Sequence, residues 1–170
     1  MPGMPPFGAE TPCSILAIGS VIEYGDTTIT CDFRGGVKHR VDVDPNDPMN
    51  SVLLRTVGFK ASAETDKGSI AIEQNDADVA PQSKLTLTQQ FPPKYTHHDV
   101  QSFIATLDLG TGEPVVLTTK EPMVCDAQLT QFPPRGDLYK LSAPVDMVDP
   151  SAPDTVVARL TTFTSKRGGL

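Results

Sequence analysis

The sequence predicts an all-β fold in one domain, an antiparallel β-sandwich or, as the alternative, a closed β-barrel. The first observation is alternation: Val37–Val43 switches between apolar and polar residues, and Lys84–Thr88 and Gln101–Leu107 behave similarly. Alternation with a period of two places one face of a strand on a core and the other in water. Second, Pro and Gly fall between the apolar runs and not inside them, which is typical of turns. Third, almost no stretch keeps the i, i+3, i+4, i+7 apolar stripe of a helix.

Runs of this kind predict strands at 14–24, 27–33, 37–43, 51–61, 69–74, 84–90, 101–108, 114–119, 123–130, 137–142 and 155–164. Gly25-Asp26 and Gly35-Gly36 are typical of hairpin turns, and a short helical turn is expected to begin at Thr96. Many short strands at regular spacing fit a sandwich or a barrel, and the long Pro-rich connections favour the sandwich. The expected core residues are Ile15, Val21, Ile29, Val41, Leu53, Phe59, Ile70, Leu85, Leu87, Phe103, Val115, Leu117, Val124, Leu138, Val156 and Phe163.

The chain divides into a Pro-rich extended arm over residues 1–12, a β domain over 13–165 and a C-terminal tail over 166–170. Three short segments recur in the same order later in the chain, beginning with Ser14–Ala17, which resembles Ser102–Ala105. This order is compatible with an internal duplication of a β-unit. A separate similarity places a Phe-Pro-Pro motif at Phe91 and again at Phe132, where two strands are expected to leave the sheet.

The net charge of −7 and the pI of about 4.8 argue against nucleic acid as a partner, because such a surface repels phosphate. No apolar run approaches the roughly 18 residues of a membrane span. The N-terminal residues lack the features of a signal peptide, and Cys13, Cys31 and Cys125 form no C-x-x-C pair. These features predict a cytoplasmic location with reduced cysteines.

The densest group of catalytically useful side chains is Tyr95, His97, His98 and Asp99. A His beside an Asp can supply an acid–base group that titrates near neutrality. Adjacent residues of a strand point to opposite faces, so His97 and His98 could share one metal only from a turn or helix start. His39 lies on the apolar face of its alternating run and could join a buried site.

No cofactor is expected, and no metal site is predicted. The Asp-x-Asp pairs at Asp42 and Asp76 lack the Gly and the final Glu of a calcium loop. Neither a nucleotide-binding glycine motif nor a G-x-S-x-G elbow is present in the sequence.

The first functional hypothesis is therefore a non-enzymatic binding or self-assembly module of β-sandwich type, with a homo-oligomer or another protein as partner. Many strands offer many sheet edges, which can pair with another copy or an extended segment. The alternative is a small β-barrel enzyme or carrier for a small apolar ligand, with a His/Asp acid–base group. An enclosed cavity of a few hundred cubic ångströms beside the candidate residues would favour this alternative.

Overall fold

The computed structural model describes residues 3–75 and 82–169 and contains antiparallel strands without a helix in these ranges. The all-β prediction is confirmed. None of the described residues form a helix with the length and hydrophobicity needed to span a membrane. The strands are β1 (Glu10–Tyr24), β2 (Thr27–Val43), β3 (Ser51–Thr65), β4 (Gly68–Gln74), β5 (Ser83–Gln89), β6 (Lys94–Gln101), β7 (Phe103–Asp108), β8 (Val115–Thr119), β9 (Met123–Leu129), β10 (Asp137–Leu141), β11 (Val145–Val148), β12 (Val156–Thr162) and β13 (Ser165–Arg167).

The described strands belong to one continuous sheet that closes on itself twice. Their order is β12-β11-β8-β7-β4-β3-β2-β1-β13-β10-β9-β6-β5, and the additional pairings β12–β1 and β3–β5 join the ends to the middle. The sheet therefore contains two rings that share β1, β2 and β3. Of the two alternatives that the sequence left open, a closed ring describes this arrangement better than two separate sheets.

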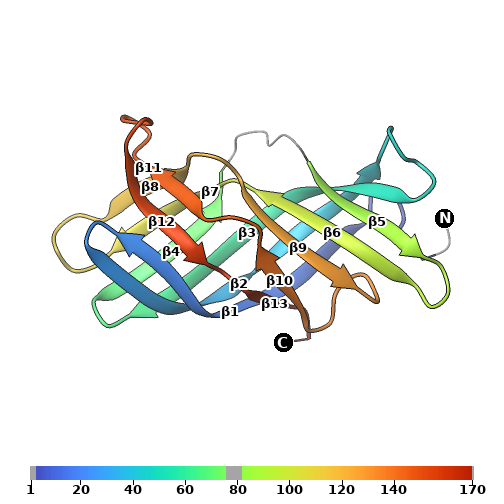
Figure 1. The fold of residues 1–170 in the computed structure, drawn as a ribbon, viewed down its shortest axis with the longest axis horizontal. Helices are drawn as coiled ribbons and strands as arrows, with labels where there is room; N and C mark the ends of the chain where they lie inside the picture. The colour runs from blue at the N-terminus through green and yellow to red at the C-terminus, as the bar shows by residue number, and fades with distance from the viewer. Residues whose placement is uncertain (1–2, 76–81, 170) are drawn as a thin grey trace.

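Each shared strand gives one half of its length to each ring. In β1, Ile15 and Leu16 pair with β13, whereas Val21–Tyr24 pairs with β12. In β3, Ser51–Leu54 pairs with β5, and Lys60–Thr65 pairs with β4. Figure 1 shows the result: β4, β8, β11 and β12 lie to the left, β5, β6 and β9 lie to the right, and β1–β3 run through both halves.

The two rings have different interiors. Apart from Ser20 of β1, the buried side chains on the ring with β4, β7, β8, β11 and β12 are apolar and include Phe33, Ile70 and Phe103. We call this the apolar ring. The ring with β5, β6, β9, β10 and β13 also has an aliphatic lining but holds charged and polar side chains as well. We call this the polar ring. Its strands and adjoining turns carry every buried polar residue of the described chain except Ser20: Thr11, His39, Asp44, Ser51, Ser83, His97, Asp99, Gln101, Ser165 and Arg167.

The predicted hairpin turn at Gly35-Gly36 is wrong, because β2 continues through it. Gly35 pairs with Ala61 of β3, and a Cβ built on Gly35 would lie 1.9 Å from the carbonyl oxygen of Lys60. No real Cβ tolerates such a contact, so a glycine is needed here for close approach of two backbones. The glycine pair thus marks the place where the shared strands pass from one ring to the other.

The helical turn predicted at Thr96 is also wrong, because this residue lies within β6. The polar run of β6 forms a strand because it pairs with β5 on one side and β9 on the other.

The predicted tail needs correction as well: Lys166 and Arg167 belong to β13, which pairs with β1 and β10. At the other end, β1 begins at Glu10, inside the expected arm.

The two Phe-Pro-Pro motifs follow β5 and β9, as predicted. Their Phe side chains differ, because Phe91 is exposed whereas Phe132 is half-buried against the core. Strands of the two rings interleave along the chain, so the rings do not correspond to its first and second halves. The internal duplication stays a prediction.

Candidate functional site

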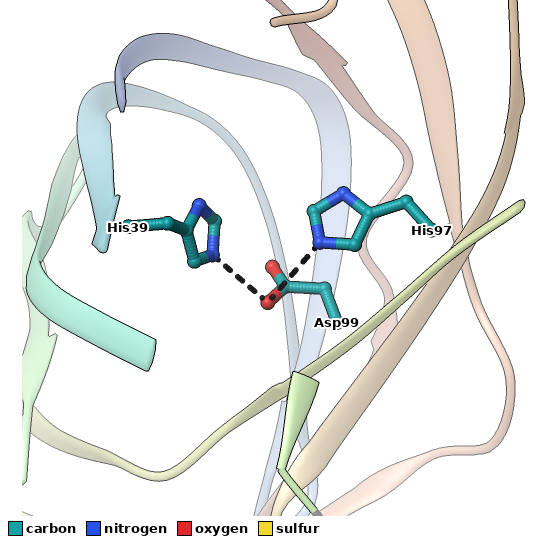
Figure 2. A group of neighbouring side chains, drawn as sticks. All are labelled: His39, His97 and Asp99. Atoms are coloured by element: carbon teal, nitrogen blue, oxygen red, sulfur yellow. Dashed lines mark hydrogen bonds and ion pairs between the residues drawn. The ribbon is translucent and has the colours of Figure 1, made fainter. Parts of the chain in front are cut away.

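The polar ring contains a cluster of buried charged and polar side chains built mainly on β6. Burial alternates along this strand, so Tyr95, His97 and Asp99 point inward whereas His98 points outward. His39 comes from the inward face of β2 and is almost fully buried. Figure 2 shows His39 and His97 approaching the Asp99 carboxylate from either side. The structure thus brings together three of the five candidate residues.

Asp99 is held on both carboxylate oxygens. Ser83 Oγ donates to Oδ1 at 2.8 Å, and His39 Nε2 lies 3.2 Å from the same oxygen. The Arg167 guanidinium donates to Oδ2 at 2.6 Å. Burial alone would raise the pKa of the Asp99 carboxyl, but the positive charge of Arg167, with help from His39, holds this pKa well below its usual range. Asp99 is therefore ionised at neutral pH.

His97 has one paired and one unpaired ring nitrogen among the described residues. Its Nδ1 lies 2.5 Å from Tyr139 Oη, whereas Nε2 has no hydrogen-bond partner among the described residues. Nε2 lies 3.9 Å from Asp99 Oδ1, which is too long for a hydrogen bond. Burial lowers the pKa of His97 to about 3, although the negative charge of Asp99 opposes this shift. The expectation that His97 titrates near neutrality is wrong, because desolvation outweighs the attraction of the carboxylate.

The remaining candidates lie outside this cluster. His98 pairs with Asp126 on the outer face of the sheet, with 2.7 Å between Nδ1 and Oδ1. Tyr95 is buried in the polar ring, and its hydroxyl donates to the carbonyl oxygen of Gly3. His98 therefore belongs to a surface pair, and Tyr95 to a contact with the N-terminal segment.

Three members of the cluster were missed by the sequence analysis. Arg167 is 1% exposed, and its guanidinium carbon lies 4.0 Å from the ring centroid of Tyr139. Tyr139 in turn contacts His97, and Ser83 contacts Asp99. The alternation through Ser165 and Arg167 was a usable signal for a strand, but the glycines that follow suggested a tail.

The cysteines are suited to packing and not to nucleophilic chemistry. Cys13, Cys31 and Cys125 are free thiols. Burial raises the pKa of each, and that of Cys125 reaches about 12. They are thus protonated at neutral pH, and a thiol is a much weaker nucleophile than a thiolate.

A small cavity adjoins the cluster. Its volume is about 10 Å³, near the minimum that holds one water molecule, and His39, His97, Tyr139 and Arg167 contribute to its lining. The interior beside these residues is thus filled, and the enclosed cavity of a few hundred cubic ångströms expected for a carrier is not found at this place.

A larger groove lies along β1, β2 and β3. It has a volume of about 930 Å³ and is open to solvent, with Ser14, Lys38 and Lys60 among its lining residues. Cys13, Val37 and Pro134 line both this groove and the small cavity. These three residues therefore border both the groove and the small cavity beside the cluster.

Comparison with known proteins shows a similar fold but no family. No family model matches the chain, and no curated protein matches it. DynF from the dynemicin biosynthesis pathway of Micromonospora chersina is similar in structure, with a TM-score of 0.71 at 19% sequence identity. The match covers 99% of this chain and 84% of the DynF chain. At this identity the likeness shows a shared fold alone.

Proposed function

We propose that this protein binds a small organic molecule, as a carrier or an enzyme, and that the ligand lies in the groove over β1–β3. The observation that carries this proposal is the position of the groove: Cys13, Val37 and Pro134 alone are shared between its lining and that of the small cavity beside the polar cluster. A polar group of the ligand reaches the cluster when Pro134 and its neighbours move aside. A groove of about 930 Å³ falls within the usual size of ligand sites.

The buried cluster supports this function because apolar side chains of similar volume could fill the same interior. Removing charges from water is expensive, and a buried ion pair is often no more stabilising than apolar side chains of similar volume. The apolar ring closes around Phe and Ile side chains on the same three shared strands. We therefore attribute the charged interior of the polar ring to ligand recognition.

The cluster favours polar recognition over general base catalysis at neutral pH. A base with a pKa of about 3, such as His97, removes protons poorly at pH 7. Its unpaired Nε2 can instead exchange a hydrogen bond with a ligand or accept a cation. Arg167 also has an unpaired buried nitrogen, Nε, among the described residues.

The similarity to DynF adds an analogy. DynF belongs to a biosynthetic pathway, whose proteins handle small organic molecules, and this chain shares its fold over nearly the whole length. This analogy raises the plausibility of a small-molecule ligand but identifies neither a compound nor a reaction.

The proposal is tested by blocking the groove. The chain has no Trp. Ser14→Trp fills the groove, whereas Ile18→Trp adds the same side chain to an exposed position of β1 outside it. The probe is 1-anilinonaphthalene-8-sulfonate, an anionic aromatic dye. We expect saturable binding of one dye per chain, at least about tenfold weaker in S14W, equivalent to about 1.4 kcal/mol, and unchanged in I18W.

Two results would contradict the groove as a ligand site. One is the absence of saturable dye binding by the native protein. The other is equal binding by S14W and I18W, which would place the dye elsewhere. Circular dichroism on both variants checks that the sheet is intact.

Self-association stays a separate prediction. The end strands β12 and β5 both pair back onto the sheet, so the free sheet ends that motivated this hypothesis are occupied. Sedimentation over a wide concentration range tests it, and a strict monomer would remove it.

A further inference from the structure

We propose that His39, His97 and Asp99 form a binding site for one divalent transition-metal ion in the polar ring. One ligand atom from each residue contributes, and these three atoms all lie within 4.8 Å of one another. Two imidazoles and one carboxylate make a donor set that suits zinc, iron, cobalt or nickel. The inference rests on the proposed function in placing the metal at the end of the ligand groove.

The distances are close to those of a metal site. Bonds of about 2.0–2.2 Å from zinc to nitrogen and oxygen place neighbouring ligand atoms roughly 3.0–3.5 Å apart. His39 Nε2 and Asp99 Oδ1 are 3.2 Å apart, within this range. His97 Nε2 and Asp99 Oδ1 are 3.9 Å apart, and the three atoms lie within 4.8 Å of one another, so metal binding requires the His97 imidazole to move closer to the other two ligands.

The unpaired nitrogen of His97 is the second observation that indicates a ligand. His97 is 1% exposed, and its Nε2 lacks a hydrogen-bond partner among the described residues although it is aimed at Asp99. Leaving a buried polar atom unpaired costs about 1–3 kcal/mol. A cation between Nε2 and Oδ1 removes this cost.

The surroundings orient the proposed ligands. Tyr139 Oη can accept a hydrogen bond from His97 Nδ1, which leaves Nε2 free of a proton and able to bind a cation. Ser83 and Arg167 fix the Asp99 carboxylate, and Arg167 occupies Oδ2 while Oδ1 faces the histidines. Three protein ligands leave at least one position open, as in catalytic metal sites.

The positive charge of Arg167 limits the affinity of this site for a metal ion. Asp99 is the carboxylate of the set, and its charge is already balanced by the guanidinium. A divalent ion therefore keeps its net charge inside the ring, where charges interact more strongly than in water. We therefore expect a preference for an anionic donor at the open position.

The experiment uses Co²⁺ as the probe, because its visible absorption reports ligand number and type. Native protein freed of metal with EDTA is titrated with Co²⁺. We expect a saturable band at one ion per chain, weakened at least about tenfold in His39→Ala and in His97→Ala. His98→Ala is the matched control: it removes a histidine from the next position of the same strand, on the outer face, and leaves the band unchanged.

X-ray absorption on the native Co²⁺ protein gives a test that does not depend on variant folding. Two imidazole ligands support the site, and one or none overturns it. Absence of a saturable band, or its loss in H98A but not in H97A, also overturns it. If Co²⁺ does not bind but the dye still binds in the groove, the metal site is ruled out and the groove proposal stands. If Co²⁺ binds but the dye does not, the groove proposal is ruled out and the metal site stands.

Discussion

The apolar and polar rings are built on the same three strands but differ in what they enclose. In the apolar ring, Phe33 and Phe163 pack with ring centroids 5.7 Å apart in an interior of aliphatic side chains. In the polar ring, the corresponding space holds Asp99, Arg167 and two histidines. Both rings close through antiparallel pairing. The comparison teaches that a ring on these three strands can close around an apolar interior, so the charges of the polar ring call for an explanation of their own.

The two interiors should also respond differently to change. Apolar contacts are numerous and individually weak, so a small loss of volume has a graded effect. A buried ion pair depends on both partners, and removal of one leaves the other as an unpaired charge. The first three predictions use this contrast.

The largest effect is expected when Arg167 alone is removed. Arg167→Met keeps much of the side-chain volume but leaves the buried carboxylate of Asp99 without its cation. We expect a loss of about 3–5 kcal/mol in the free energy of unfolding, measured in urea. A loss below about 1 kcal/mol would show that the interior of the polar ring is hydrated enough to tolerate the charge.

The second prediction concerns acid. The pKa of His97 is about 3 in the folded protein and about 6.5 in the unfolded chain. Between these values the unfolded chain binds a proton that the folded protein does not, so stability falls as pH falls. The expected contribution is about 1.4 kcal/mol per pH unit between pH 6 and pH 4. Asp99 adds a further loss at lower pH, as pH falls through its depressed folded pKa.

Unfolding free energies of the native protein and His97→Phe, measured at pH 7, 6, 5 and 4, isolate this contribution. The native protein should lose about 3 kcal/mol more than H97F between pH 6 and pH 4. Parallel pH profiles would mean that the His97 imidazole takes up its proton in the folded protein.

The third prediction tests the apolar ring and has a smaller effect. Phe33→Leu reduces volume at a fully buried position and removes the aromatic contact with Phe163. We expect a loss of about 1–2 kcal/mol that is equal at pH 7 and pH 5, because no titratable group is involved. A loss that changes with pH would show that the two interiors are coupled through the shared strands.

The sequence predicted the strand character of most of the chain and placed His39 on an apolar face, because alternation determines which side chains share a face. His97 and Asp99 were instead expected in a connection with a short helical turn. Their shared inward face, with His98 outward, follows from the pairing of β6 with β5 and β9. Local pattern was sufficient for His39 because it lies inside a long alternating strand.

The remaining members of the site depend on contacts that local pattern does not contain. Leu138 was expected in the core, but it is 55% exposed, and the neighbouring Tyr139 is buried instead. A shift of one residue in the predicted alternation exchanges the inward and outward faces of a strand. A short polar strand such as β10 contains too few apolar residues to show which face is buried. Arg167 was assigned to a tail because its partners Asp99 and Tyr139 lie 68 and 28 residues away in sequence.

The continuity of β2 through Gly35-Gly36 was missed for the same reason. A glycine pair indicates a turn when only its neighbours in sequence are considered. Here the glycine makes room for Lys60 of a neighbouring strand. The double ring therefore follows from long-range pairing and could not be derived from the local signals.

The most direct test of our account is the free energy of unfolding of the triple variant His39→Leu, Asp99→Leu, Arg167→Met. It replaces the charged centre of the polar ring with apolar side chains. His97 keeps its hydrogen bond with Tyr139, and Ser83 keeps its hydrogen bond to the carbonyl oxygen of Val100. If the cluster serves function and not folding, the triple variant unfolds within about 1–2 kcal/mol of the native protein. A loss as large as the 3–5 kcal/mol expected for R167M alone would contradict this claim, because the polar ring would then need its charges to fold.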